Sequence, residues 1–257
     1  MQNSPNHVLD QWGQVVQTLD PITLSEMDGV KLMKRVDTKF VVSYAVAMEW
    51  MQNLGAHYRV LDINGNRIQT YNTRYFDTAD LYFYTMHHNS RSNRFKVRKR
   101  NYRESNLAFL EIKRKDNKKV THKNRIKTPE DQFDLLPEDE AAFIAKTIGK
   151  EMELFPVIDT HFKRITLASE LFQERITVDL ELHFETSDVE KKPEGIVVIE
   201  LKQPKFNPNS PAFIALRNYG VRKSSMSKYC IGMAMCKPHL KHNAFKAKLR
   251  EIEKLKK

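Results

Sequence analysis

The stretch RFKVRKRNY at residues 94–102 constrains the fold more than any other part of the sequence. If it forms a β-strand, its side chains alternate between two faces. Its four even-numbered cations then share one face with Tyr102, and Phe95 and Val97 lie on the other. Like charges side by side repel by about 1 kcal/mol at 4 Å in water and about 4 kcal/mol at an effective dielectric of 20. Such a face is either solvated or binds an anion.

The same alternation recurs in the predicted strands at 35–42, 107–115, 119–128, 173–185 and 195–203, each with one apolar and one ionic face. A sheet that is solvated on one side shows this pattern too. Here, however, the cations are concentrated, and the acidic residues gather mainly in two strands, TVDLELHFE and VVIELK. Curling the sheet with its apolar face outward would give a barrel lined by cations, with a carboxylate cluster able to hold a divalent metal.

The remaining pattern completes an α+β chain. A further long strand is predicted at 154–168, helices at 5–19, 44–55, 210–218 and 226–236, and a loop followed by a helix within 129–149. No repeat or linker interrupts this order. We therefore expect an antiparallel β tunnel barrel with helices packed outside, formed by one domain over 1–236 that includes the N-terminal helix.

Residues 237–257 form a basic tail, with eight Lys and Arg and two Glu against a net charge of +11 for the whole chain. Phe245, Leu249 and Ile252 recur at helical spacing, which predicts an amphipathic helix. This helix could be a solvated one that docks by its apolar stripe. Alternatively, it could contact a membrane surface or a partner.

Several classes are disfavoured. The chain has eight glycines and no Gly-rich phosphate loop, so side chains would have to hold any phosphate. It lacks an apolar run of about 18 residues and a signal-like N-terminus, which predicts a cytoplasmic protein. Cys230 and Cys236 are expected to be reduced. The nine histidines lack metal-ligand spacing, which argues against a His/Cys metal site.

Eight short motifs carry a family resemblance: RVDTKFVV, YFDT, VRKRNY, FLEIKRK, VTHKNRI, RITVDLEL, VVIELK and SKYCIG. In this order, they resemble the VTC domain, the polyphosphate polymerase module of the triphosphate tunnel metalloenzyme (CYTH-like) superfamily. The resemblance runs from about residue 24 to residue 234. It implies an antiparallel tunnel that threads a triphosphate or polyphosphate past basic side chains, with Mn²⁺ or Mg²⁺ at a glutamate.

Matching the motifs residue by residue implies roles for individual side chains. Those implied to act in catalysis are Lys39, Arg98, Arg100, Lys113, Arg164 and Lys228. These six, together with Lys123, Arg125, Arg175 and Lys202, are implied to bind phosphate. Glu200, with Asp179 and Glu181, is implied to hold the metal. The first strand departs from the E-x-E-x-K of the wider superfamily, because Arg35 and Asp37 stand before Lys39.

Three functions remain open. The first is a polyphosphate polymerase that transfers the terminal phosphoryl group of a nucleoside triphosphate, ATP by preference, to a growing chain. The second is a metal-dependent triphosphatase or polyphosphate hydrolase, in which Asp37 or Glu181 would orient water. The third is a polyphosphate-binding module without activity. Nucleic acid is not an expected partner, because the cations alternate with apolar residues and not with exposed aromatic side chains.

Overall fold

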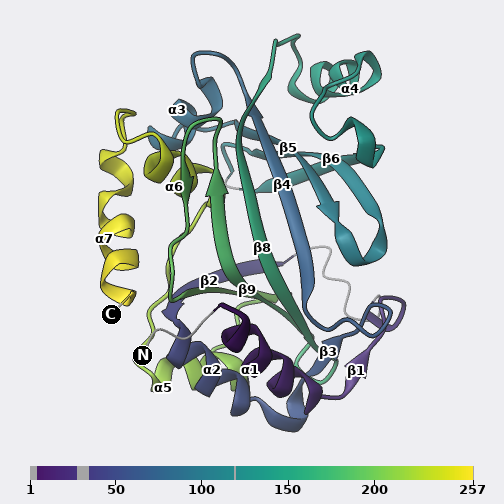
Figure 1. The fold of residues 1–257 in the computed structure, drawn as a ribbon, viewed down its shortest axis with the longest axis vertical. Coiled ribbons are helices and arrows are strands. Elements are labelled where there is room, and N and C mark those ends of the chain that lie inside the picture. Colours follow the sequence, from purple (N-terminus) through teal and green to yellow (C-terminus); the bar gives the residue numbers. More distant parts are fainter. Residues whose placement is uncertain (1–4, 28–34, 119, 257) are drawn as a thin grey trace.

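A long, curled β-sheet forms the centre of the molecule, and helices lie around it (Figure 1). The structure is a computed structural model that describes residues 5–27, 35–118 and 120–256. The strands are β1 (Pro21–Ile22), β2 (Val36–Ser43), β3 (Arg59–Leu61), β4 (Gln69–Asp77), β5 (Arg94–Tyr102), β6 (Leu107–Lys115), β7 (Thr121–Lys127), β8 (Phe155–Ser169), β9 (Glu174–Glu185), β10 (Glu190–Lys191) and β11 (Ile196–Gln203). The helices are α1 (Pro5–Gln17), α2 (Tyr44–Gln52), α3 (Tyr82–His88), α4 (Glu138–Ile148), α5 (Pro211–Asn218), α6 (Lys228–Cys236) and α7 (Lys246–Leu255).

The main path of the sheet runs β2-β11-β9-β8-β4-β5-β6-β7. Every ladder along it is antiparallel, and the short β1 pairs in parallel with β3. Within the described residues, the end strands β2 and β7 do not pair with each other, so the sheet is not closed by hydrogen bonds. Side chains of β2 and β6 nevertheless line one hollow, although five strands separate them along the sheet. The sheet therefore curls into a tunnel, which confirms the predicted α+β fold.

Helices α1, α2 and α5 cover the outer face of the sheet at its lower end (Figure 1). The outward residues of β2, β11, β9 and β8 pack there against Trp12, Trp50 and Leu216, which are fully buried. The indole of Trp50 donates a hydrogen bond to the Ala212 carbonyl at 3.0 Å, which joins α2 to α5. This apolar layer is what turns the ionic faces of these strands inward.

A second apolar layer covers the outer face of β4, β5 and β6, where α3 and α4 pack. Helix α3 was not among the predicted helices, because it is short and its N-terminal support comes from outside it. Buried Asp77, at the end of β4, accepts hydrogen bonds from the backbone N–H groups of Phe83 and Tyr84 at 2.8 and 2.9 Å. Its carboxylate also accepts the Tyr229 hydroxyl of α6. Asp77 thus anchors two helices, which explains its place in the YFDT motif.

Helix α6 packs on the inner side of the sheet, where its apolar residues join Tyr75, Phe162 and Phe184 in one core. Gly232 is required for this approach: a Cβ atom at this position would lie 2.7 Å from the Phe184 ring. Helix α7 adds its stripe of Phe245, Leu249 and Ile252 to the same core. The stripe therefore docks on the protein's own core, as one of the two interpretations of the tail predicts.

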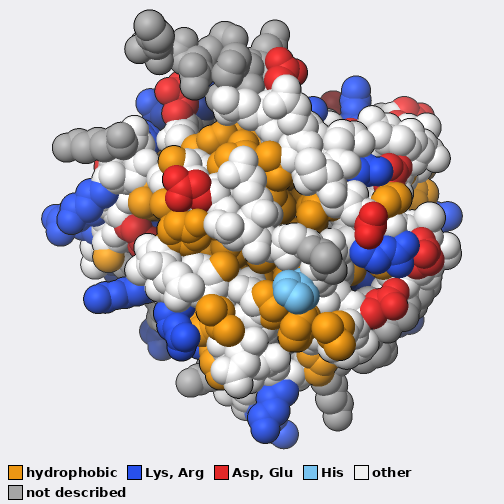
Figure 2. Space-filling view, turned by 90° about the horizontal axis from the view of Figure 1, so that it is seen from below, with side chains coloured by type: hydrophobic (Ala, Val, Ile, Leu, Met, Phe, Trp, Pro, Cys, Tyr) orange, Lys and Arg blue, Asp and Glu red, His pale blue; other side chains and the backbone are white. Residues whose placement is uncertain are grey.

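The face at the lower end of the molecule carries apolar side chains near its centre and Lys and Arg mainly toward its rim (Figure 2). The positive charge of the chain is thus not gathered at the centre of this face. Among the described residues, no helix is both long and apolar enough to cross a membrane.

Candidate functional site

The ionic face of β5 turns into the tunnel, as its alternation predicts. Val97 packs outward in the core beneath α3 and α4. On the opposite face, Lys96, Arg98 and Arg100 point inward beside Tyr75 and the strands β4 and β6. The arginines are almost fully buried, at 7% and 6% exposure. Because buried arginine needs anionic or hydrogen-bonding partners, the partners of these cations define the site.

The tunnel holds a hollow of ≈ 510 Å³ between β2 and β11 on one side and β5 and β6 on the other. Residues 224–227, just before α6, also line it, as do Ala244, Phe245 and Lys248 at and just before the start of α7. Its charged lining comprises six cations and two carboxylates: Lys39, Arg94, Lys96, Lys113, Lys115, Lys248, Asp37 and Glu200. The hollow is therefore suited to an anion with several charges.

Glu111 of β6 forms the first of three carboxylate centres. Arg98 donates two hydrogen bonds to its Oε2 atom, from Nε at 2.9 Å and from Nη2 at 2.6 Å. Lys123 of β7 pairs with its other oxygen. Burial alone would raise the pKa of Glu111, but the charges of Arg98, Arg100 and Lys123 outweigh this effect and hold the pKa far below its usual range. Glu111 is thus a permanent anion.

Asp179 of β9 forms the second centre. Arg164 of β8 grips both of its oxygens, at 2.6 and 2.8 Å, and Lys228 at the start of α6 pairs with Oδ2. Burial raises the pKa of Asp179, and the charges of Arg164 and Lys228 lower it further than burial raises it. Both cations also lie over the Phe162 ring, with Lys228 Nζ at 4.4 Å from its centroid. This aromatic wall orients them.

Glu200 of β11 forms the third centre, at the edge of the hollow. It pairs with Lys39 through one oxygen and with Lys202 through the other, at 2.9 Å. Burial raises the pKa of this carboxyl, but Lys202 and Lys39 hold it well below its usual range. A carboxylate beside a space for phosphate oxygens matches how Mg²⁺ and Mn²⁺ are usually held, through one or two carboxylates plus substrate phosphates. The residues present therefore fit such a metal.

Lys113 of β6 differs from the cations around it, because no hydrogen bond or ion pair engages its ammonium among the described residues. The charge of Arg98, burial and the charge of Arg100 lower the pKa of Lys113 well below its usual value. Its amine lines the hollow directly. The charges of Glu111 and Glu200 raise this pKa in part, but neither carboxylate pairs with the amine, so an anionic ligand would supply the direct partner that it lacks.

Three other predicted residues lie in different surroundings. Glu181 is exposed at a β-bulge of β9, with φ 51°, and its nearest charges are Glu194, Lys163 and Lys192. The structure thus does not bring it to Asp179 or Glu200, because the bulge turns it out of the inner face. Arg175 donates to the Met27 carbonyl at 3.1 Å, and Arg125 lies over the Phe109 ring at 4.5 Å.

Three residues of the tunnel were missed by the sequence-based assignment: Glu111, Lys96 and Lys248. The first two share strand faces with assigned residues, so the alternation itself was a sufficient signal for them. Lys96 donates to the Ser227 hydroxyl at 2.9 Å, just before α6. Lys248 reaches the hollow from α7, where it pairs with Glu251 and Ser224. Only the folded chain brings that helix to the tunnel.

Fold and site together define an anion-binding tunnel of the triphosphate tunnel type. The family model described as "VTC domain" matches residues 34–237, and the chain belongs to this family. The predicted resemblance is thus confirmed. Family membership indicates an enzyme that acts on triphosphate or polyphosphate and requires a divalent metal.

Solved structures give distant likenesses. The PH1819 protein from Pyrococcus horikoshii OT3 is 15% identical with a TM-score of 0.45, and the alignment covers 78% of this chain and 99% of that one. The HpAC1 protein from Hippeastrum, described as a "putative adenylyl cyclase" with a dominant triphosphatase activity, is 13% identical with a TM-score of 0.48, and the alignment covers 79% of this chain and 97% of that one. No curated protein matches the chain.

Proposed function

We propose that this protein is a polyphosphate polymerase, which transfers the terminal phosphoryl group of a nucleoside triphosphate to a polyphosphate chain inside the tunnel. The observation that carries the proposal is Lys113, a cation without a hydrogen-bond or ion-pair partner among the described residues, which lines the hollow and whose pKa is lowered by the charges of Arg98 and Arg100. A chain of phosphates supplies closely spaced negative charges along a line, which suits a tunnel lined by cations along its length. ATP is the proposed donor. Because ATP is abundant in the cytoplasm, we propose that the protein works in that compartment.

The proposed phosphate ligands are the inward cations. Arginine would grip phosphate oxygens through its planar fork, and lysine would act as a point charge. Arg98 and Arg164 would share their guanidinium groups between a carboxylate and the substrate, which keeps them oriented before binding. The full proposed set is Lys39, Arg98, Arg100, Lys113, Lys123, Arg125, Arg164, Arg175, Lys202 and Lys228.

The inward carboxylates favour phosphoryl transfer to phosphate over hydrolysis. An efficient general base has a pKa near the working pH, whereas the pKa values of Glu111, Asp179 and Glu200 are all held low by paired cations. Hydrolysis would need another residue to activate water, and Asp37 is the remaining carboxylate that lines the hollow. The terminal phosphate of a polyphosphate chain is already ionised near neutral pH, so its attack on the donor needs no base. Positioning and charge neutralisation then dominate catalysis.

Glu200 is the proposed ligand of Mn²⁺ or Mg²⁺. When bound, the metal would neutralise negative charge on the phosphates of the nucleotide. Lys39 and Lys202 would exchange their ion pairs with Glu200 for contacts with phosphate oxygens as the substrate enters. Asp179 lies one strand away, on β9, and would hold Arg164 and Lys228 in place.

The test is to incubate the purified protein with ATP and Mn²⁺ and to separate the phosphate products. We expect acid-stable chains longer than the triphosphate. Glu200→Gln should lower this turnover by more than about tenfold, while tripolyphosphate binding without metal is retained. If orthophosphate is the only product, the protein is a hydrolase and not a polymerase. If it binds tripolyphosphate but does not turn over ATP, it is a polyphosphate-binding module.

A further inference from the structure

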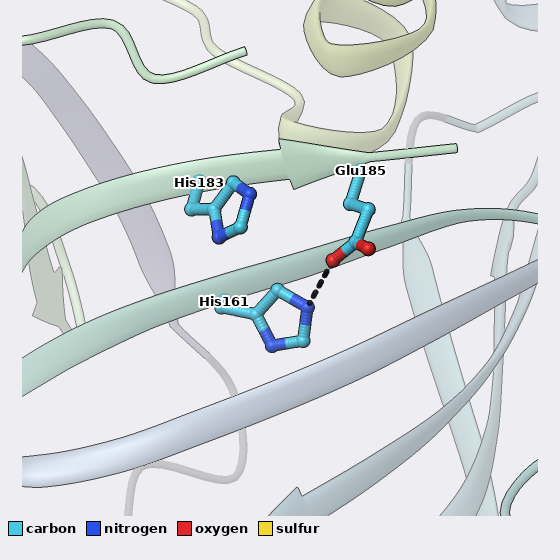
Figure 3. A group of neighbouring side chains, drawn as sticks. All are labelled: His161, His183 and Glu185. Atoms are coloured by element: carbon cyan, nitrogen blue, oxygen red, sulfur yellow. Dashed lines mark ion pairs between the residues drawn. The ribbon is translucent and has the colours of Figure 1, made fainter. Parts of the chain in front are cut away.

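Two histidines and a glutamate meet on the outer face of the sheet, away from the tunnel (Figure 3). His161 belongs to β8, and His183 and Glu185 belong to β9. The histidines are directly opposite each other in the β8–β9 ladder. One ligand atom from each of the three residues lies within 4.8 Å of the other two. This is the one such group of at least three His, Cys, Asp or Glu in the described part of the chain.

The bulge at Glu181 is what places this group on the outer face. Before the bulge, Leu180 packs outward against the helices at the lower end, whereas after it Leu182 packs inward beside α6. The pairing shifts accordingly between His161 and Lys163 of β8. Because side chains alternate, the shift turns His183 and Glu185 outward, next to His161. Two strands thus deliver their ligands to one point.

His161 is oriented as a metal ligand. Its Nδ1 atom lies 2.9 Å from Asn72 Oδ1, so that Nδ1–H donates to the amide oxygen. In the neutral ring this donation leaves the lone pair on Nε2, which faces Glu185 Oε2 at 3.6 Å. That distance is too long for a hydrogen bond. A histidine whose other nitrogen donates to a fixed acceptor is the usual arrangement around a bound metal.

His183 offers a second nitrogen with no aligned hydrogen bond. Its Nε2 atom is buried and lies 2.9 Å from Glu190 Oε1 of β10, but the geometry does not make a hydrogen bond. Glu190 brings a further oxygen to this side, and its Oε1 atom also pairs with Lys192 at 2.6 Å.

We propose that His161, His183 and Glu185 form a binding site for a Zn²⁺-like transition-metal ion, with Glu190 or water as the fourth ligand. Two imidazoles with carboxylate oxygen are a ligand set that Zn²⁺ accepts in tetrahedral geometry, whereas Mg²⁺ prefers oxygen alone. Ligand atoms about 2.0–2.1 Å from such an ion lie about 3.3 Å apart. The group therefore has to contract only modestly to close around it.

The ion would join β8 and β9 where the bulge interrupts their regular pairing. Through Glu190 it would also hold β10, which pairs with β9 through only two residues. The site uses none of the residues proposed to bind phosphate. It would therefore stabilise the sheet independently of turnover.

The test is calorimetric titration of the metal-free full chain with ZnCl₂, in excess MgCl₂ to occupy the tunnel. We expect one site, and both His161→Ala and His183→Ala should weaken its affinity by more than tenfold. Asn72→Ala, which removes the orienting acceptor, should weaken it by about tenfold. His239→Ala, at an exposed histidine elsewhere, and Glu200→Gln should leave it unchanged.

Two further measurements keep the test independent of how well the variants fold. A hundredfold excess of Zn²⁺ over its Kd should raise the melting temperature of the wild type by about 5–10 °C. Co²⁺ bound to the wild type should show the visible absorption of a tetrahedral site. The proposal fails if the wild type shows neither effect. It also fails if both histidine variants bind Zn²⁺ as tightly as the wild type does.

Discussion

Lys99 and Lys113 lie on neighbouring strands but in opposite surroundings: Lys99 is fully buried, and Lys113 is half-buried at the wall of the hollow. Lys99 points outward from β5 with 0% exposure, where its ammonium lies 2.7 Å from Glu140 of α4 and donates to the carbonyls of Gln132 and Leu135 at 2.6 and 2.5 Å. Lys113 points inward from β6 and makes no such contact within the described residues. One lysine is fully satisfied by the protein, and the other is not.

The difference separates structure from function. A buried charge with a full set of partners holds elements together, in this case α4 and its preceding loop on β5. A half-buried charge without a direct partner destabilises the ligand-free protein and is compensated only when an anion binds. The first kind of residue should therefore control stability, and the second should control affinity. Each substitution below tests one side of this contrast.

The largest effect is expected for Lys99→Met. Loss of the cation leaves Glu140 buried without its counter-charge, which typically costs 3–5 kcal/mol, or about 6–20 °C in melting temperature for a chain of this size. Thermal unfolding measures this effect. Tripolyphosphate affinity of the folded variant should be unchanged, and a weakened affinity would contradict the separation of the two roles.

Lys113→Met should have the opposite profile. The variant should be at least as stable as the wild type, because it removes an uncompensated cation beside Arg98. Its tripolyphosphate affinity should fall by about 10- to 150-fold, the equivalent of a charge-assisted hydrogen bond worth 1.5–3 kcal/mol. Calorimetric titration measures the change, with Lys146→Met on exposed α4 as the matched control. Equal losses in both variants would remove Lys113 from the site.

The contrast also predicts a pH dependence. The pKa of Lys113 is lowered in the folded protein, so between that value and about 10.4 the unfolded chain binds more protons. The stability of the empty protein attributable to this residue therefore increases as pH rises through that window. Melting temperatures of the wild type and Lys113→Met from about pH 7 to about pH 9.5 should diverge at the lower pH values. Parallel curves would show that the Lys113 ammonium is not penalised.

The smallest effect is expected for Lys248→Ala. This lysine lines the hollow but already pairs with Glu251, so binding a phosphate exchanges one partner for another. An ion pair of this kind is worth up to about 1 kcal/mol, which limits the loss of tripolyphosphate affinity to about fivefold. Titration against the wild type checks this. A larger loss would make α7 part of the central site, which the sequence places in a separate tail.

Much of the tunnel could be predicted from alternation alone. The inward positions of Arg98, Arg100 and Lys113 follow from strand parity, because their neighbours Val97 and Ile112 must reach an apolar core. The same parity predicts that Glu111 points inward, but it does not predict that Glu111 pairs with several cations at once. A sequence does not show which cations an acid will meet across a ladder, and Arg98 and Lys123 reach Glu111 from two different strands.

The histidine group could not be predicted for a different reason. His161 and His183 are far apart in the sequence, and their meeting depends on the register of two strands around a bulge. The absence of metal-ligand spacing argues only against ligands that are close in sequence. Likewise, α3 depends on Asp77 of another element for its N-terminal hydrogen bonds. Such features depend on tertiary contacts, which local patterns do not report.

The bulge at Glu181 also bears on how sequences of this kind can vary in length. Removing this one residue would bring Leu182 directly after Leu180, so strict alternation along β9 would be restored and every later side chain of the strand would keep its present face. Leu182 and Phe184 would still pack inward beside α6, and His183 and Glu185 would still point outward. A deletion at Glu181 should thus disturb the fold less than deletion of a regularly paired residue such as Val178, which would turn the side chains on one side of it to the opposite face. Among descendants of this chain, selection should tolerate the loss of Glu181 more readily than the loss of its neighbours in β9.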